Sequence, residues 1–322
     1  RLDKINAIYK VNPAGKVDHI VGLGSQHEAH FSMGGDRLAW SEIRVHPRWV
    51  REDHSVIIVY DLNKNSKSQI TTKGKYFTPG LDASGQKIAA LHTDSLGNHN
   101  LHILDAKSGK VLNVLPNPSN YYYAYPTWSA DNKKVLTTAR DDSGRMSLMY
   151  VDVESGKVNV IMHWSYHIFG RPLQYDNWIY VTSNIDDTDH VYAINPEEGI
   201  PYRVTKGPKS YYSPTYDPVN DEIICGEYSV QGNRLKRISA DARNWKTRNM
   251  GHGEKEFATS GKERDILSEV PQKSYTPKKY SKWAHPINFH SANVTLDDPV
   301  YEIEVLAENV LSSIGFSTGY RY

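Results

Sequence analysis

The sequence predicts an all-β protein with the architecture of a six-bladed β-propeller. Short alternating runs broken by Gly, Asn, Asp and Pro occur along most of the 322 residues, which is typical of strands and hairpins. The aromatic residues are 22 Tyr beside 7 Trp and 6 Phe, and Tyr favours half-buried strands. A hairpin pattern recurs at intervals of 42 to 51 residues, which matches the period of propeller blades.

The clearest repeating unit reads as strand, tight polar turn, strand. Its fifth position holds a turn-forming residue such as Asn12 or Asp105, whose side chain bonds its own backbone and starts the reversal. A glycine such as Gly109 then supplies the positive φ that the turn requires. The copies begin at Ile8, Val59, Leu101, Leu148, Val191 and Leu235.

A second element, a polar turn leading into an apolar strand, precedes five of these copies. We expect the inner strands of the blades to begin near Ala29, Pro79, Pro126, Pro172 and Pro214. The copy at Ile8 lacks such a partner, so the first blade is incomplete at the N-terminus. Because open strand edges are a liability, we expect either residues upstream of Arg1 or the segment after Met250 to complete it.

Composition excludes several classes of protein. Lys and Arg number 38 against 37 Asp and Glu, a net charge of +1, so no basic footprint for nucleic acid is present. No apolar run reaches the length of a transmembrane helix. The single cysteine, Cys225, excludes a disulfide framework within the chain and a zinc site built from cysteines.

Two sets of motifs resemble a known family. The segment Pro126 to Lys134, P-x-W-S-A-D-x-K-K, and the x-D-x-x-S-G-K hairpin after it resemble the repeats of TolB-like propellers, over Asn6 to about Asn249. The segments 40–62 and 280–294 and the C-terminal run resemble Gram-negative outer-membrane proteins, in which such a propeller precedes a surface-antigen-type β-barrel. The N-F-H-S lead-in to that barrel is matched by Asn288, Phe289, His290 and Ser291.

This resemblance implies a domain organisation. We expect a propeller over 1–250, a linker over 251–282, and a pre-barrel segment with a first barrel strand over 283–322. The alternation in Val300 to Val310 is partial, so helix and strand remain alternatives there. Some relatives carry a metallopeptidase-like domain before the propeller, but its H-E-x-x-H signature is missing here, so no peptidase activity is carried over.

Aromatic residues directly before the repeat starts are the candidate binding residues. In a propeller these segments lie on one face around the central channel, and loops on a rigid scaffold commonly carry function. Tyr is favoured at binding hot spots. The alternative is that the rings pack one blade against the next. The predicted rim of the channel mouth consists of Tyr76, Tyr123, Tyr125, Phe169 and Tyr212.

No catalytic set and no metal site is predicted. Gly315 to Gly319 spells G-x-S-x-G, but that motif needs a later acid and histidine, and only three residues follow it. His92, His99 and His102 flank a hairpin whose ends approach each other, with ordinary structural roles as the alternative. The loops Asp141-Asp142 and Asp186 to Asp189 offer oxygen ligands for a structural Ca²⁺, but they are also ordinary turns.

We therefore expect a non-catalytic propeller that binds a ligand or protein, or serves as a scaffold, in an outer-membrane protein of the cell envelope. The expected partners are an envelope protein and the remainder of its own chain or a barrel subunit. One alternative is an enzyme of lyase or hydrolase type with its site at the channel mouth, which would require several charged groups to meet there within hydrogen-bond range. Another is an accessory propeller of a peptidase.

Overall fold

The computed structural model describes residues 6–12, 14–46, 52–72, 74–248, 250, 270–271, 273–276 and 287–322. The chain divides into two compact units, Arg1–Glu256 and Phe257–Tyr322. Within the described residues the only helical element is the 3₁₀ turn η1 (Ala242–Asn244), so the predicted all-β class is confirmed. Across that same part of the chain, no helix is long and apolar enough to cross a membrane.

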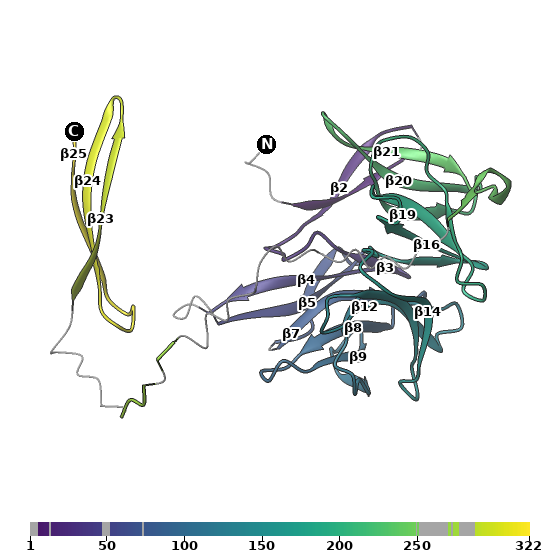
Figure 1. Ribbon diagram of the computed structural model, residues 1–322, viewed down its shortest axis with the longest axis horizontal. Coiled ribbons are helices and arrows are strands. Elements are labelled where there is room, and N and C mark those ends of the chain that lie inside the picture. Colours follow the sequence, from purple (N-terminus) through teal and green to yellow (C-terminus); the bar gives the residue numbers. More distant parts are fainter. Residues whose placement is uncertain are drawn as a thin grey trace. The chain divides into compact units, whose positions relative to one another are not determined.

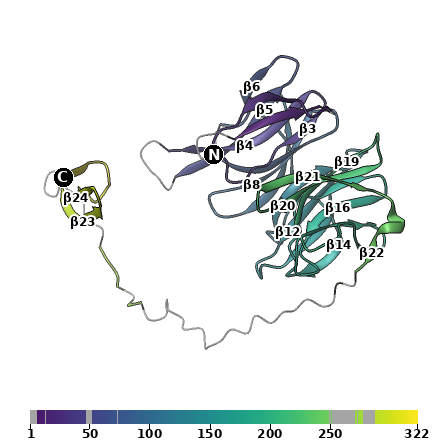
Figure 2. The same cartoon turned by 90° about the horizontal axis from the view of Figure 1, so that it is seen from above.

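The first unit is a series of antiparallel sheets taken in chain order (Figures 1 and 2). It begins with the hairpin of β1 (Ala7–Val11) and β2 (Val17–Gly22). In the next sheet, a single parallel contact between Ser55 and Lys75 joins two four-stranded meanders. The meanders consist of β3 (Ser32–Gly34), β4 (Arg37–Val45), β5 (Asp53–Asp61), β6 (Ser66–Gln69), β7 (Lys75–Leu81), β8 (Lys87–Thr93), β9 (His99–Asp105) and β10 (Val111–Leu115).

Three more sheets complete the first unit. A four-stranded sheet contains β11 (Tyr122–Trp128), β12 (Lys134–Arg140), β13 (Met146–Asp152) and β14 (Val158–Ser165). A five-stranded sheet contains β15 (Leu173–Tyr175), β16 (Trp178–Ser183), β17 (His190–Ile194), β18 (Pro201–Arg203) and β22 (Lys246–Thr247). A three-stranded sheet contains β19 (Tyr211–Asp217), β20 (Glu222–Ser229) and β21 (Gly232–Ser239).

The repeat turns have the chemistry that the sequence predicts. The Oδ1 atom of Asp105 accepts a hydrogen bond from the amide of Ser108 at 2.7 Å, and Gly109 has a φ of 70°. The next copy repeats this arrangement, since Asp152 Oδ1 accepts from the Ser155 amide at 2.8 Å. The β1–β2 hairpin has no inner strands among the described residues, so the count of six blades remains a prediction.

β15 begins at Leu173, beside the predicted Pro172, and β3 begins at Ser32, close to Ala29, but the other three inner strands begin earlier than predicted. β7, β11 and β19 begin at Lys75, Tyr122 and Tyr211, upstream of the prolines that we expected to start them. Each of these strands pairs with its neighbour on both sides of a register shift just before or at the proline. A bulge of this kind lets a strand continue through a proline that cannot donate to the ladder. The aromatic segments are therefore the first residues of inner strands rather than connections between blades.

Apolar clusters between neighbouring sheets hold the first unit together. Leu91 and Leu101, from β8 and β9, share one buried cluster with Val135 and Met149, from β12 and β13. This central-strand packing repeats between β11–β14 and β15–β18, where Leu148 meets Ile179. A central strand that lies between two other sheets is buried on both of its faces. Consecutive residues along such a strand are therefore apolar, which explains the near-continuous apolar runs.

A buried carboxylate organises the outer part of the β3–β6 meander. Glu42 on β4 accepts hydrogen bonds from the Gly24 amide at 2.9 Å, Trp40 Nε1 at 2.8 Å and Arg44 at 2.8 Å. Lys67 on β6 donates a fourth at 2.5 Å. Burial alone would raise the pKa of Glu42, but the hydrogen bonds from Lys67, Trp40, Gly24 and Arg44 together lower it to about 2.

We predict that Glu42→Gln lowers the free energy of unfolding by about 2 kcal/mol at pH 7, because it leaves buried donors short of a charged acceptor. The folded-state pKa lies below the unfolded value of about 4.3. The contribution is therefore fully present above that value and is lost as the pH falls toward 2. Urea denaturation at pH 7 and pH 3 measures it, with the exposed Glu154→Gln as control. Equal stability of both variants at pH 7 would contradict the prediction.

The second unit contains one three-stranded antiparallel sheet with two chemically distinct faces. Its strands are β23 (Asn288–Asp297), β24 (Val300–Glu308) and β25 (Gly315–Arg321). The register places Val294 opposite Ile303 and Ile303 opposite Tyr320, so apolar residues share one face. Glu302 pairs with Thr295 and Arg321 on the other face. The strand alternative for Val300 to Val310 is the one observed, over Val300–Glu308.

Most of the predicted linker, 251–282, lies outside the described residues, as do residues 283–286 of the predicted pre-barrel segment. The three domain boundaries therefore remain predictions. The C-terminal extension toward a barrel also remains a prediction, although 287–322 contributes three strands where we expected a first strand.

Candidate functional site

Four residues occupy the same position of the repeat, directly before a proline. They lie in or just before the first strand of four successive repeats, β7, β11, β15 and β19. Thr78, Tyr125, Arg171 and Ser213 each precede the proline of their copy. Thr78, Tyr125 and Ser213 have φ values of 44°, 54° and 51°, a region that non-glycine residues rarely occupy. Backbone strain of this kind persists where the surrounding structure imposes it, and it is frequent at functional sites.

Hydrogen bonds join these segments from one sheet to the next. The Tyr125 amide on β11 donates to Thr78 Oγ1 on β7 at 3.1 Å. Two residues further along β11, Thr127 Oγ1 donates at 3.0 Å to the carbonyl of Pro172, which leads into β15. These bonds place Arg171 beside Tyr125.

Four side chains converge at this position, and we call them the inner-strand cluster: Glu28, His30, Tyr125 and Arg171. The hydroxyl of Tyr125 donates to Glu28 Oε1. The rings of His30 and Tyr125 lie 5.5 Å apart, centroid to centroid. Burial raises the pKa of Tyr125, and the bond to Glu28 raises it further, so the hydroxyl remains a donor at neutral pH.

His30 and Arg171 are the electrostatically unusual members of the cluster. Burial lowers the pKa of His30 to about 3, with the charge of Arg171 acting in the same direction and a backbone hydrogen bond with Pro79 opposing it. Burial also lowers the pKa of Arg171. The cluster therefore holds a neutral imidazole at pH 7 beside the guanidinium of Arg171 and the side chain of Glu28. Sequence reasoning selected only Tyr125 as a binding residue, because the H-E-A-H run that contains Glu28 and His30 lacks the spacing of a helical zinc site and Arg171 lies far from it in the sequence.

The predicted rim residues divide into two groups. Tyr76, Tyr123 and Phe169 are 6%, 1% and 1% exposed, which fits the packing alternative for these rings. Tyr125 is half-buried within the inner-strand cluster. Tyr212 is 37% exposed, and its hydroxyl donates to Asp189 Oδ2 at 2.8 Å. Of the five predicted residues, only Tyr125 and Tyr212 therefore present part of their rings to solvent.

We predict opposite effects for two substitutions of Tyr123. Its hydroxyl is buried without a hydrogen-bond partner, so Tyr123→Phe should leave the unfolding free energy unchanged or raise it by up to about 1 kcal/mol. Tyr123→Ala empties a site in the core between two sheets and should cost about 3–5 kcal/mol.

Chemical denaturation followed by fluorescence measures both effects, with Tyr212→Phe as the solvent-exposed control. A large loss in Tyr123→Phe would show that the hydroxyl does have a stabilising partner.

The histidine and aspartate candidates occupy separate places. His92 and His102 do converge, stacked at 4.4 Å, and His102 Nδ1 lies 3.1 Å from the Tyr76 hydroxyl. His99 is bonded to Thr93 instead. Asp186 binds Arg203 and Arg248, and Asp141 binds Arg145, so both acidic loops considered for Ca²⁺ contain carboxylates held by arginine. Within the described part of the chain, no three His, Cys, Asp or Glu residues group as metal ligands would.

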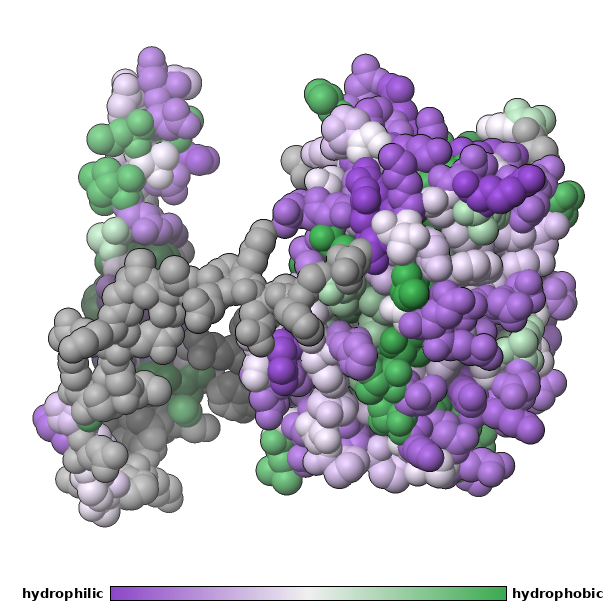
Figure 3. All heavy atoms as spheres, turned by 45° about the vertical axis from the view of Figure 1, so that its right-hand side comes forward, coloured by the Kyte–Doolittle hydropathy of each residue, from purple (hydrophilic) through white to green (hydrophobic). Residues whose placement is uncertain are grey.

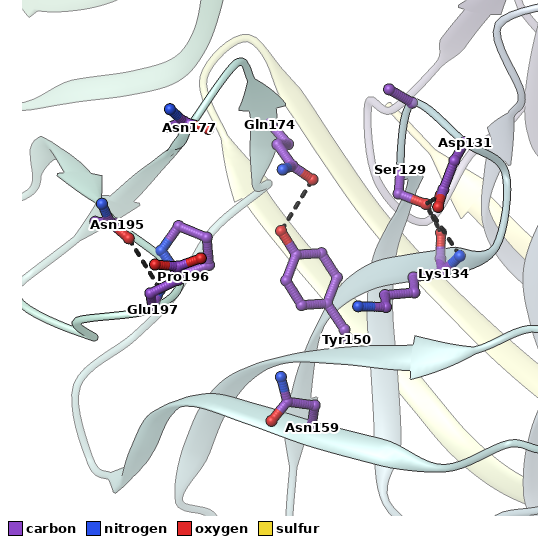
Figure 4. A pocket seen from close by; sticks show the side chains of 11 residues that line it. Ser129, Asp131, Lys134, Tyr150, Asn159, Gln174, Asn177, Asn195, Pro196 and Glu197 are labelled. Carbon is purple, nitrogen blue, oxygen red and sulfur yellow. Dashed lines mark hydrogen bonds between the residues drawn. The ribbon is translucent and has the colours of Figure 1, made fainter.

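A polar pocket of about 530 Å³ lies between the β11–β14 sheet and the β15–β18 sheet (Figure 4). The Tyr150 hydroxyl donates to Gln174 Oε1 at 2.9 Å across it, and Lys134 Nζ lies 5.6 Å from the centroid of the Tyr150 ring. Asn195 and Glu197 bound its other side, joined by a bond from the Glu197 amide. Because Tyr150, Gln174 and Asn195 already have hydrogen-bond partners, the pocket is a weaker candidate than the inner-strand cluster.

Solved structures share the fold. TolB from Acinetobacter baumannii superposes with a TM-score of 0.57 at 16% identity, covering 74% of this chain and 58% of that one. A structure assigned to TolB from Agrobacterium tumefaciens gives 0.52 at 13% identity, covering 94% and 83%. An oligogalacturonate lyase in complex with manganese gives 0.50 at 13% identity, covering 76% and 72%.

These likenesses confirm the TolB-like propeller fold. The chain spans somewhat more than half the length of the Acinetobacter TolB. No protein family and no curated protein matches the sequence.

Proposed function

We propose that this chain is a non-catalytic binding propeller of the Gram-negative cell envelope, with its ligand or protein partner held at the inner-strand cluster. The observation that carries this proposal is the convergence of Glu28, His30, Tyr125 and Arg171 from successive sheets. A rigid scaffold that presents a cation, a carboxylate and an aromatic ring together has the chemistry of a recognition site. The shared fold with TolB and the sequence resemblance support an envelope location.

Partner contact at this end of the strands can be tested by photo-crosslinking in Gram-negative cells that produce the protein. We expect benzoylphenylalanine in place of Tyr212, at the start of β19, to form an adduct that Tyr125→Ala diminishes. The same probe in place of Val219, which is 88% exposed in the turn after β19, should form none. Equal adducts from both positions, or none from Tyr212, would count against a binding site at this end.

The C-terminal sheet supports attachment to the outer membrane through the C-terminal region, as the barrel resemblance implies. Seven large side chains of its apolar face, which we call the C-terminal apolar face, are exposed, and Figure 3 shows apolar residues at the surface of this sheet. Exposed apolar surface of this extent marks a contact with lipid or protein. The face comprises Phe289, Val294, Leu296, Tyr301, Ile303, Phe316 and Tyr320.

We predict that the protein floats with vesicles of phosphatidylethanolamine and phosphatidylglycerol in a density gradient. Ile303→Asp should lower the bound fraction at least fivefold, because it places a charge in the centre of the C-terminal apolar face. Ser317→Asp, on the opposite face of the same sheet, should leave flotation unchanged. If both variants float like the wild type, the face does not contact lipid.

An enzyme of lyase or hydrolase type is the second candidate function. The observation that favours it is the presence of an acid, a histidine, a tyrosine and an arginine in one cluster. Proton transfer requires the acid and base to lie within hydrogen-bond reach of the reacting group or of each other. The one hydrogen bond within the cluster joins Tyr125 to Glu28, so the described groups do not form a catalytic relay, and binding is the better supported function.

A further inference from the structure

Two positions of the repeat meet at the boundary between neighbouring sheets. The first lies two residues before the side chain that caps the turn after a third strand, and the second lies two residues after the proline of the next repeat. The capping side chain accepts a hydrogen bond from the amide two residues later in four copies, at Asp61, Asp105, Asp152 and Asn195. At three of these four boundaries both positions hold aliphatic or aromatic residues that pack in one cluster: Val59 with Leu81, Ile103 with Trp128, and Ala193 with Tyr216.

The fourth boundary, between the β11–β14 and β15–β18 sheets, departs from this pattern. Its two positions hold Tyr150 and Gln174, whose side chains are joined by a hydrogen bond of 2.9 Å. The β15–β16 turn is also two residues shorter than its three equivalents, since four residues separate Gln174 from its strand partner Ile179, whereas six separate Trp128 from Val135. A smaller polar side chain and a shorter turn thus replace the packing of a tryptophan, and the pocket of about 530 Å³ lies at this boundary (Figure 4).

The pocket also contains polar side chains without partners, and these include both donors and acceptors. Among the described residues, the carboxamides of Asn159 and Asn177 form no hydrogen bond, and Lys134 and Glu197 form no ion pair. Figure 4 shows Lys134 and Asn159 on one side of the pocket and Asn177 and Glu197 on the other. A carboxamide offers a donor and an acceptor side by side. The matching ligand therefore carries groups that both donate and accept, as hydroxyls do.

Charge, polarity and volume narrow the class of ligand further. One basic side chain, Lys134, and two acidic ones, Asp131 and Glu197, line the pocket, so it has no surplus of basic groups to attract an anion. Of the lining residues, only Ala130 and Pro196 lack polar side-chain atoms, and a mainly apolar molecule would leave the amides without partners. The volume lies within the range of about 300–1,000 Å³ that small-molecule sites occupy.

We propose that this pocket binds a neutral oligosaccharide, whose hydroxyls pair with the carboxamides of Asn159 and Asn177. Adjacent hydroxyls of a sugar ring match the donor and the acceptor of one carboxamide. The lining side chains come from strands and tight turns of two packed sheets, which hold a site in place more precisely than long loops do. No lining residue belongs to the inner-strand cluster, so this inference goes beyond the proposed function and is tested independently of it.

Four trisaccharides test the ligand class. Maltotriose, cellotriose and triacetylchitotriose are neutral, whereas trigalacturonate carries a carboxylate on each ring. Titration calorimetry on the full chain at millimolar concentration should detect binding of at least one neutral trisaccharide, with trigalacturonate at least tenfold weaker. No binding of any neutral trisaccharide, or equal binding of trigalacturonate, would overturn the proposal.

Two substitutions test the named side chains. Asn159→Ala and Asn177→Ala should each weaken binding of that trisaccharide at least fivefold, because each removes a hydrogen-bonding group from the pocket. Asn233→Ala, which removes an exposed carboxamide from β21, is the matched control and should bind normally. Unchanged affinity in both pocket variants would overturn the assignment of the site.

A third substitution restores the pattern of the repeat at this boundary. Gln174→Trp introduces the residue that Trp128 supplies one repeat earlier, and its indole should fill the pocket and abolish binding. Its Tm should stay close to that of the wild type, because the equivalent boundary accommodates a tryptophan. Full affinity in a folded Gln174→Trp variant would show that the ligand binds elsewhere. If this variant does not fold, the two asparagine variants decide the question.

Discussion

The backbones of successive inner strands approach each other to contact distance, and the rest of the first unit depends on this approach. A Cβ atom added to Gly80 would lie 1.9 Å from the carbonyl oxygen of Pro126, and one added to Gly34 would lie 2.0 Å from that of Asp82. Trp128 Nε1 donates to the carbonyl of Gly80 at 2.9 Å across the same boundary. No side chain fits at these two glycines, so the backbones of neighbouring inner strands lie in direct contact there.

This close packing constrains the backbone of the inner-strand cluster on both sides. Tyr125 has a positive φ directly before a proline, a conformation that costs free energy and is kept only because contacts on both sides impose it. Its amide is held by Thr78, and its hydroxyl by Glu28. A site fixed in this way loses little conformational entropy when a ligand binds, which favours affinity without any closing movement.

The sequence predicted the fold because its repeats carry local chemistry that is independent of tertiary context. The turn at Asp105 and Gly109 forms from its own side chain and φ preference, and it appears where expected. The starts of β7, β11 and β19 were predicted too late, because a proline is typical of a strand start, whereas a bulge lets these strands continue through it. Likewise, Tyr123 and Tyr212 look alike in sequence, and only the packing of neighbouring sheets decides that one is buried and the other exposed.

The members of the inner-strand cluster come from residues 28, 30, 125 and 171, so no local pattern could reveal them together. What unites them is a shared electrostatic condition. The described side chains leave one cation without a counter-ion and one neutral acceptor without a donor. A complementary anion would relieve the first of these conditions, as the proposed binding function requires. Catalysis instead requires groups that interact more strongly with the transition state than with the substrate. Unpaired groups that are already in place before a ligand arrives fit the proposed binding function.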